Sequence, residues 1–331
     1  MSWLEPDDPR WSALLAQFEH DVHHLPRYVA LEGERLAGQG VALLARSSSG
    51  VALLPLVLRP VPGFGVDATS PYGYPAPLCS GVAEPLIGAL MASLRERGVI
   101  AAFVRGHPLL ASPRAALAEH GEVVEQGETV WIDLRASAAE QWAGHRATHR
   151  NLIHRLRREA FVVELDFACT GLDEFFDVYA ATMQRVGADW ASFGRAWIEG
   201  LVGALGGQVF LARVSLAGRL AAAAMFTRCG GIVQYHLSGT ADEFQAASPS
   251  RLLIDEVRRW ASAEGLRALH LGGGVGSRDD ALLRFKQGFS PRRGRHWSFR
   301  AVLNSEVYRS ASGGESSPQS DFFPAYRRPK S

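Results

Sequence analysis

One lysine stands out among the basic side chains of this sequence. The chain has 331 residues, of which 35 are lysine or arginine, yet the only lysines are Lys286 and Lys330. Lys330 lies beside the C-terminus in a segment that we expect to be disordered, so Lys286 is the single lysine expected within folded sequence. A lysine ammonium is a compact point charge, unlike the planar guanidinium of arginine. The composition therefore favours a site that needs a point charge at position 286.

Two histidines are expected on neighbouring strands of one sheet. His236 and His270 lie in apolar segments, residues 235–240 and 266–271, that are typical of strands. Imidazoles that face one cleft can act as a base or as hydrogen-bonding groups. The alternative is a structural histidine within the sheet, and the sequence leaves both interpretations open.

The stretch before Lys286 combines glycines with carboxylates. The run Gly272–Gly274 follows a strand expected to be buried, so the backbone there can approach a ligand or simply form a tight turn. Asp279 and Asp280 come just before the helix expected to carry Lys286. A carboxylate at that position either caps the helix or orients the lysine or an amine substrate.

Arginines offer two places for phosphate groups. Arg146 and Arg150 begin a basic stripe that recurs every four residues on a helix expected to start near Trp142. Such a stripe binds phosphates or is a solvated basic face. Arg251 lies at the start of another expected helix, where the N-terminus favours an anion or is simply capped by Ser248.

The overall composition indicates a globular chain with two cores. Hydrophobic residues make up 47% and charged residues 21%, and the net charge of +1 gives no global excess that would attract nucleic acid, membranes or acidic partners. Cys79, Cys169 and Cys229 have no metal-ligand spacing, so we expect no disulfide, no metal and a cytoplasmic location. The longest apolar stretch, Val51–Leu58, is far shorter than a membrane span. The sequence also lacks hydrolase-elbow, Walker and zincin motifs.

The two halves of the chain share one hydrophobic pattern, which predicts an α/β (α+β) fold with an internal repeat. Each half contains an apolar hairpin, a strand ending in tyrosine and glycine, a helix closed by glycine, a further strand and a short helix. The segments are 41–58, 70–75, 84–97, 99–104 and 113–120 in the first half, and 209–226, 235–240, 250–264, 266–271 and 279–287 in the second. Helices 172–186 and 193–205 precede the second run. We expect domains at 1–135 and 136–309 and a flexible tail at 310–331, in which residues 322–326 can dock locally.

Three local motifs carry a family resemblance. They are Tyr-His-Leu-Ser-Gly-Thr from Tyr235, Leu-His-Leu-Gly-Gly-Gly from Leu269 and Arg-Phe-Lys-Gln-Gly-Phe from Arg284. Together they resemble the Fem-type aminoacyltransferases and their BioF2-like relatives, and Ser-Pro-Tyr-Gly-Tyr-Pro from Ser70 extends the resemblance into the first half. The resemblance covers most of residues 20–308. It implies two tandem GNAT-like domains, each a mixed, mostly antiparallel sheet flanked by helices.

The resemblance also implies an activity. Such enzymes move an aminoacyl group from charged tRNA, or an acyl group from a thioester, onto an amine, often on a cell-wall precursor. The segment 240–250 has no glycine after Gly239 and carries two acids, which disfavours a backbone cradle for the pyrophosphate of CoA. Aminoacyl-tRNA is therefore our first hypothesis for the donor, with no tightly bound cofactor and a monomeric enzyme. The alternatives are an acyl-CoA-dependent N-acyltransferase and a non-catalytic module that binds RNA or a peptide.

Site residues follow from the motifs and from the reasoning above. The resemblance places a functional lysine at Lys286, near the substrate phosphate or the reacting carbonyl. The expected catalytic residues are Lys286, His236 and Asp280. The expected donor-phosphate residues are Arg146, Arg150 and Arg251. The expected substrate-binding residues are Tyr72, Tyr74, Tyr235, Ser238, His270, Gly272, Gly273, Gly274 and Phe285. The first two of these tyrosines lie in a loop that lines an acceptor groove between the domains or forms a packed turn.

Overall fold

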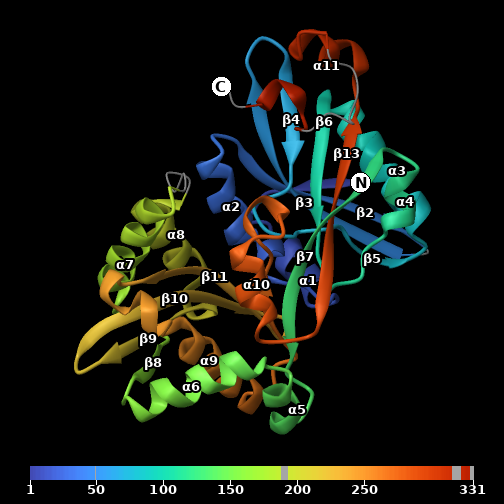
Figure 1. The fold of residues 1–331 in the computed structure, drawn as a ribbon. Coiled ribbons are helices and arrows are strands. Elements are labelled where there is room, and N and C mark those ends of the chain that lie inside the picture. The colour runs from blue at the N-terminus through green and yellow to red at the C-terminus, as the bar shows by residue number, and fades with distance from the viewer. Residues whose placement is uncertain (49, 188–192, 315–321, 329–331) are drawn as a thin grey trace. The chain divides into compact units, whose positions relative to one another are not determined.

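The computed structural model describes residues 1–48, 50–187, 193–314 and 322–328. Two compact units make up the chain: unit 1 is Met1–Gln126 with Arg295–Ser331, and unit 2 is Gly127–Gly294. This division differs from the expected boundaries at 135/136 and 309/310. Residues 297–302 of strand β13 (Arg293–Val302) pair with β6 (Val99–Gly106), so the chain returns to unit 1 before the expected end of the second domain. Figure 1 shows β13 alongside β6.

The sheet of unit 1 runs in the order β1-β2-β3-β4-β6-β13, and β5 pairs with β3. The strands not yet given are β1 (Ser2–Leu4), β2 (Gln39–Ser47), β3 (Gly50–Val61), β4 (Gly65–Thr69) and β5 (Leu78–Gly81). Only β4 and β6 pair in parallel, and the other pairs are antiparallel. The expected apolar hairpin is confirmed as β2 and β3, with Val41 opposite Leu56.

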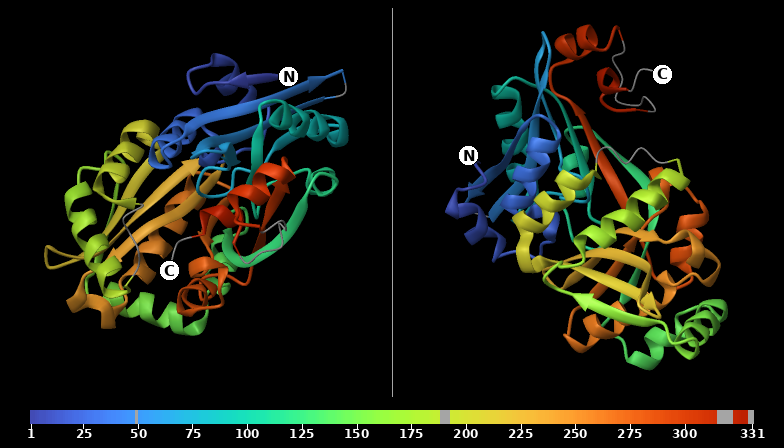
Figure 2. Two further views of the ribbon diagram at one scale, coloured as in Figure 1. Left: turned by 90° about the horizontal axis from the view of Figure 1, so that it is seen from above. Right: turned by 90° about the vertical axis from the view of Figure 1, so that its left-hand side faces the viewer.

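Alternate residues of these strands face two helical layers. Val41 and Leu43 pack in one apolar cluster with α3 (Ala83–Glu96) and α4 (Arg114–Ala118). Ala42 and Leu44 pack in another cluster with α1 (Pro9–Leu15) and α2 (Pro26–Arg35). Because side chains alternate along a strand, these helices lie on opposite faces of the sheet. Figure 2 shows the helices on both sides of the blue strands.

The sheet of unit 2 runs in the order β7-β12-β11-β10-β9-β8. Its strands are β7 (Glu122–Asp133), β8 (Val162–Asp166), β9 (Val209–Leu216), β10 (Arg219–Cys229), β11 (Ile232–Thr240) and β12 (Ala268–Gly272). Only β11 and β12 pair in parallel. Helices α6 (Ala147–Arg158) and α9 (Ser250–Ala263) contribute to the core cluster on one face. Helix α7 (Leu172–Arg185) packs against β10 and β11, and α8 (Arg195–Leu205) packs against β9.

The two sheets have the same strand order and the same single parallel pair, which confirms the expected internal repeat. One expected helix is divided: α5 (Ala138–Ala143) and α6 are separated at residues 144–146, where the Arg146 N–H donates to the carbonyl of Gly288. None of the described helices is long and apolar enough to cross a bilayer.

The end of the chain is only partly described. Beyond α11 (Ser305–Ala311), residues 315–321 and 329–331 of the expected tail lie outside the described residues. Between them, the Phe323 ring is buried beside that of Tyr308, at a centroid distance of 5.9 Å. The segment 322–328 therefore packs onto unit 1 as the apolar pattern allowed.

Candidate functional site

The parallel strands β11 and β12 of unit 2 pair over a short length. Their last paired residues are Gln234 and His270, while β11 continues to pair with β10 as far as Thr240. The imidazole Nδ1 of His270 lies 2.5 Å from Oε1 of Gln234, and the side chain of His270 is fully buried. His270 therefore joins the two strands where their pairing ends, which agrees with the structural interpretation of this histidine.

Lys286 lies just beyond that point, on the short helix α10 (Ala281–Gln287). Its side chain is 7% exposed, and Nζ donates a hydrogen bond of 2.6 Å to the carbonyl of Gly273. The ammonium lies 6.0 Å from the centroid of the Tyr235 ring. Gly272 has a φ of +75°, and a Cβ there would lie 3.4 Å from Nζ. The glycine run and Tyr235 therefore enclose the ammonium, and a larger residue at 272 would crowd it.

Burial controls the charge of this lysine. Burial lowers the pKa of Lys286 to about 8, and the negative charge of Asp280 opposes that shift. The Asp280 Oδ1 accepts from the N–H of Leu283 at 2.8 Å and Oδ2 accepts from the N–H of Val275 at 2.8 Å. Asp280 thus caps α10 and ties the glycine loop to it. The structure supports a role in capping and in positioning the lysine, since backbone amides engage both oxygens.

The remaining residues of the Tyr235 motif divide between the two faces of β11. The Tyr235 hydroxyl donates to Oγ of Ser238 at 2.6 Å, and the Tyr235 ring packs against the core cluster. A register shift opposite Met225 and Phe226 makes His236 the extra residue of a β-bulge. Its ring lies 5.6 Å from that of Trp197 on α8. His236 thus packs toward α8, whereas Tyr235 and Lys286 lie together.

Arg251 is a second, partly buried cation in unit 2. Its guanidinium lies 5.1 Å from the centroid of the Phe285 ring, and burial lowers its pKa. Among the described residues, no carboxylate pairs with it and its buried Nε has no hydrogen-bond partner. Burial and then the charge of Arg251 lower the pKa of neighbouring His149 to about 4, and His149 Nε2 lies 3.0 Å from the carbonyl of Phe285. The site thus has an unpaired cation beside the Phe-Lys motif.

The structure separates the two arginines of the expected basic stripe. Arg146 is exposed at the start of α6 and contributes to the positive surroundings of His149. Arg150 instead donates from Nη1 to the carbonyls of Ala143 and His145, at the end of α5. The helix break at residues 144–146 exposes those carbonyls, so Arg150 is occupied by backbone acceptors.

Tyr72 and Tyr74 belong to unit 1, in the loop between β4 and β5. Tyr74 is partly buried, and its ring lies 5.4 Å from that of His296 in an edge arrangement. Tyr72 is 42% exposed, but its N–H donates to Glu32 and its carbonyl accepts from the Tyr28 hydroxyl. The loop itself is therefore a packed turn that presents the Tyr72 ring at the surface.

A cluster in unit 1 has residue types that can bind a metal. The ligand atoms of Asp21, His23 and His107 lie within 4.8 Å of one another. The His107 Nδ1 accepts from the N–H groups of Leu109 and Leu110, at 3.0 and 3.1 Å. Its Nε2 must then carry the proton and donate to Asp21 Oδ2 at 3.0 Å. This geometry fits a hydrogen-bonded histidine–aspartate pair better than a metal centre.

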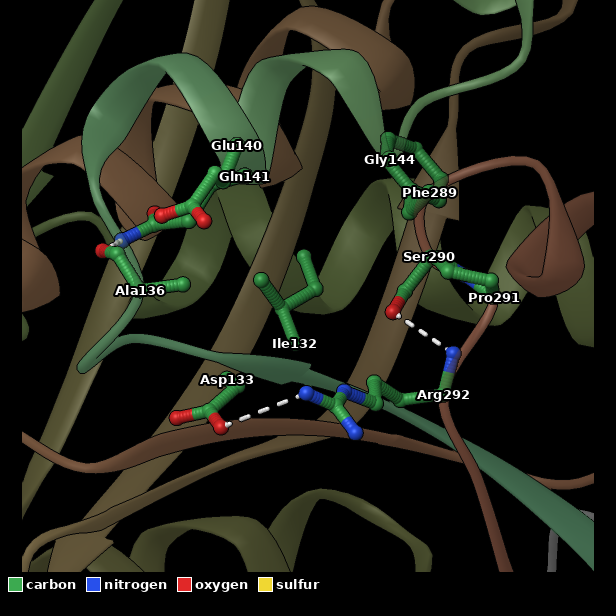
Figure 3. A pocket seen from close by; sticks show the side chains of 10 residues that line it. All are labelled: Ile132, Asp133, Ala136, Glu140, Gln141, Gly144, Phe289, Ser290, Pro291 and Arg292. Carbon is green, nitrogen blue, oxygen red and sulfur yellow. Dashed lines mark hydrogen bonds and ion pairs between the residues drawn. The ribbon is translucent and has the colours of Figure 1, made fainter.

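A cavity of about 430 Å³ in unit 2 was missed by the sequence analysis. Figure 3 shows Asp133 and Arg292 on one side and Glu140 of α5 on the other. Asp133 pairs with Ala268 at the first residue of β12, whereas Gly272 ends that strand beside Lys286. The cavity therefore lies at the opposite end of β12 from the ammonium.

Comparisons with known proteins agree with the expected fold. Residues 143–287, which include Lys286, match the model of the acetyltransferase (GNAT) domain. FemX has a similar structure, with a TM-score of 0.73, 14% identity, and coverage of 94% of this chain and 99% of that one. L-PGS from Bacillus licheniformis has a TM-score of 0.60 and 15% identity over 90% of this chain and 93% of that one.

A third similar structure is the C-terminal domain of a putative lysylphosphatidylglycerol synthetase from Agrobacterium fabrum. It has a TM-score of 0.58 and 16% identity over 83% of this chain and 90% of that one. No curated protein matches the chain by sequence. Identities this low show a common fold and no more. The expected fold class is confirmed: the chain has the fold of FemX, and its second unit contains an acyltransferase domain of the GNAT type.

Proposed function

We propose that this chain is an N-acyltransferase that moves an aminoacyl group from aminoacyl-tRNA to the amine of a small molecule or peptide. The observation that carries the proposal is the state of Lys286, which is buried within the acetyltransferase domain. An ammonium has three hydrogens to donate, and among the described residues its only acceptor is the carbonyl of Gly273. Two donors thus remain for a ligand.

In acyl transfer, N–H donors of this kind can stabilise the negative charge of the transition state. The acceptor amine attacks the ester carbonyl of the donor, the carbon–nitrogen bond forms, and negative charge develops on the carbonyl oxygen. The carbon–oxygen bond to the ribose then breaks, and the proton lost by the amine goes to the ribose hydroxyl. A cation fixed in a site with little water stabilises the oxyanion strongly, because the charges are poorly screened there. Lys286 can supply this charge at neutral pH, since its pKa is about 8.

The start of α9 favours tRNA over CoA as the donor. The N–H of Arg251 donates to the carbonyl of Ser248, and those of Leu252 and Leu253 donate to the carbonyl of Pro249. A pyrophosphate cradle requires such amides to be available. With these backbone amides already bonded, the phosphates of the donor must be bound by side chains, chiefly those of Arg251 and Arg146, which suits a larger donor. The lysylphosphatidylglycerol synthetases that share the fold are named for an aminoacyl product, which agrees with this choice.

The test compares donors and variants in the full chain. A tRNA pool charged with radiolabelled amino acids is used for filter binding and for transfer to a panel of amines, and acetyl-CoA is titrated by calorimetry. We expect the charged tRNA to bind, and Lys286→Met to bind it within a few fold while transfer falls roughly 100-fold. Arg284→Met, on the exposed side of α10, is the matched control and should keep both properties.

Two other results would replace the proposal. Heat of binding with acetyl-CoA, together with no retention of charged tRNA, would identify an acyl-CoA-dependent N-acyltransferase. Tight retention of RNA or a peptide without transfer from either donor would identify a non-catalytic module.

A further inference from the structure

Unit 1 contains a cavity of about 240 Å³ whose lining is rich in arginine. Its charged residues come from four segments of unit 1: β3, β6, β13 and the C-terminal segment beside β4 (Figure 1). The lining includes Arg59, Arg105, Arg300, Arg327, Phe103 and Phe323. The sequence analysis did not predict this cluster, and the net charge of +1 for the whole chain conceals it.

One buried carboxylate holds two of these arginines in place. Asp67 is fully buried and accepts two hydrogen bonds from Arg59, at 2.8 and 3.0 Å. Arg327 donates to the same carboxylate at 3.0 Å and to the carbonyl of Pro60 at 2.7 Å. Their side chains are 15% and 29% exposed, so neither is an ordinary solvated arginine. This pair is fixed by the fold while sharing a single negative charge.

Arg105 has no such partner. Among the described residues, no carboxylate forms an ion pair with it and its side chain makes no hydrogen bond. Its guanidinium lies 4.9 Å from the centroid of the Phe103 ring, on the same strand. Against the effect of burial, the negative charge of Glu32 raises the pKa of Arg105 slightly, but the Glu32 carboxylate forms its ion pair with Arg35, at 2.7 Å. Arg105 is partly buried, and this burial lowers the pKa of its guanidinium.

A buried cation costs folding free energy unless a negative group compensates it. Among the described residues, Asp67 is the acid that binds Arg59 and Arg327, and Arg105 forms no ion pair, so these three arginines and Asp67 together carry a net charge of about +2. Planar guanidinium groups match phosphate oxygens in pairs of parallel hydrogen bonds. The volume of the cavity is below that of typical drug-sized sites, so the cavity suits a compact group.

We infer that unit 1 has an anion site that binds a phosphate or diphosphate group between Arg105, Arg300 and the pair held by Asp67. The aromatic side chains of Phe103 and Phe323 form the apolar side of the site and can contact the substituent that the phosphate carries. This site is distinct from the Lys286 site in unit 2 and does not depend on the proposed transfer reaction.

Calorimetry with inorganic pyrophosphate tests the inference directly. We expect the unmodified chain to bind pyrophosphate, with affinity that falls as salt rises, and Arg105→Gln to weaken binding roughly 10-fold to 100-fold. Arg105→Lys keeps the positive charge but loses the planar, paired N–H donors of the guanidinium, so this variant should recover only part of the affinity. Arg95→Gln, an exposed residue of α3 in the same unit, should bind like the unmodified chain.

Several outcomes decide the matter. If Arg105→Gln fails to fold, Arg327→Gln serves as a second variant, and we expect it to bind pyrophosphate more weakly than the unmodified chain. Thermal melting of each variant shows whether it is folded. Vesicles of phosphatidylglycerol, with phosphatidylcholine as control, distinguish a lipid source of phosphate from a soluble one, and arginine-dependent binding to either supports the site. Absence of binding to both probes, or equal binding by the unmodified chain, Arg105→Gln and Arg327→Gln, would overturn the inference.

Discussion

The buried ammonium of Lys286 makes the stability of the folded chain depend on pH in a recognisable way. Burial lowers its pKa from 10.5 to about 8. In the unfolded chain the same lysine has its ordinary pKa, so between these pH values the unfolded state binds more protons than the folded state. Raising the pH through this window therefore favours the folded state. A shift of this size corresponds to about 3 kcal/mol, gained progressively and complete above the unfolded pKa.

Replacement of Lys286 by methionine removes this dependence. Urea unfolding, followed by circular dichroism from pH 7 to pH 10.5, measures the free energy of unfolding of both proteins. The difference between the unmodified chain and Lys286→Met should increase in favour of the unmodified chain by up to about 3 kcal/mol across that range. Arg284→Met controls for other groups that titrate at high pH, because the exposed Arg284 keeps its charge throughout. Its curve should parallel that of the unmodified chain.

The comparison at pH 7 separates a functional lysine from a structural one. Lys286→Met loses the hydrogen bond to Gly273, worth roughly 1–3 kcal/mol, but also removes a desolvated charge of similar cost. We therefore expect its stability to lie within about 1 kcal/mol of the unmodified chain while transfer is lost. Parallel pH curves for the two proteins, or a loss at pH 7 well above that value, would refute the reasoning that the ammonium is held at a cost for function.

Three further changes test the surroundings of the site and the core of unit 2. Asp280→Ala removes the cap of α10 and the tie to the glycine loop, so urea unfolding should show a loss of about 1–2 kcal/mol. The pKa of Lys286 should also fall further, moving the alkaline limb of the pH–rate profile to lower pH. Burial raises the pKa of Asp255, but contacts with a histidine and an arginine outweigh it and hold the pKa at about 2. Acid unfolding should therefore show that the unmodified chain loses about 2 kcal/mol of stability between pH 4 and pH 2. Asp255→Asn should not show this loss. Gly272→Ala should cost about 1–2 kcal/mol in urea unfolding because φ is positive there, and should reduce transfer because the added methyl group contacts Nζ.

Local patterns in the sequence predicted most of the individual elements but not the division of the chain. Apolar runs around a turn gave both hairpins, and glycines after the helices gave the ends of α3 and α9, because these signals lie within a few neighbouring residues. Strand β13 was missed, although its pairing with β6 decides where unit 1 ends. That pairing joins residues far apart in the sequence, and alternation along one strand does not specify its partner.

The candidate site was predictable where composition gave a signal. Lys286 was chosen as a candidate because lysine is so rare in this chain, whereas its burial depends on Gly273 and Tyr235, which lie elsewhere in the sequence. Arg150 was assigned to phosphate from its spacing, but a helix break places backbone carbonyls within its reach. Arg105 gave no signal, because it is one of many arginines and gains its surroundings only when separate strands and the C-terminal segment come together.

Three cations that are buried or partly buried, and that form no ion pair with an acid among the described residues, link the two proposals. Lys286 and Arg251 in unit 2, and Arg105 in unit 1, each have a pKa lowered by burial. The buried Arg258, in contrast, forms an ion pair with Asp255. The fold can therefore place an acid beside a buried arginine where the arginine has only a structural role. Apolar side chains in place of the three cations would avoid the cost of desolvation. A negative ligand would remove that cost in the complex, and the free energy so released would favour binding. Anion binding should therefore raise the melting temperature of the unmodified chain more than that of variants that lack these cations.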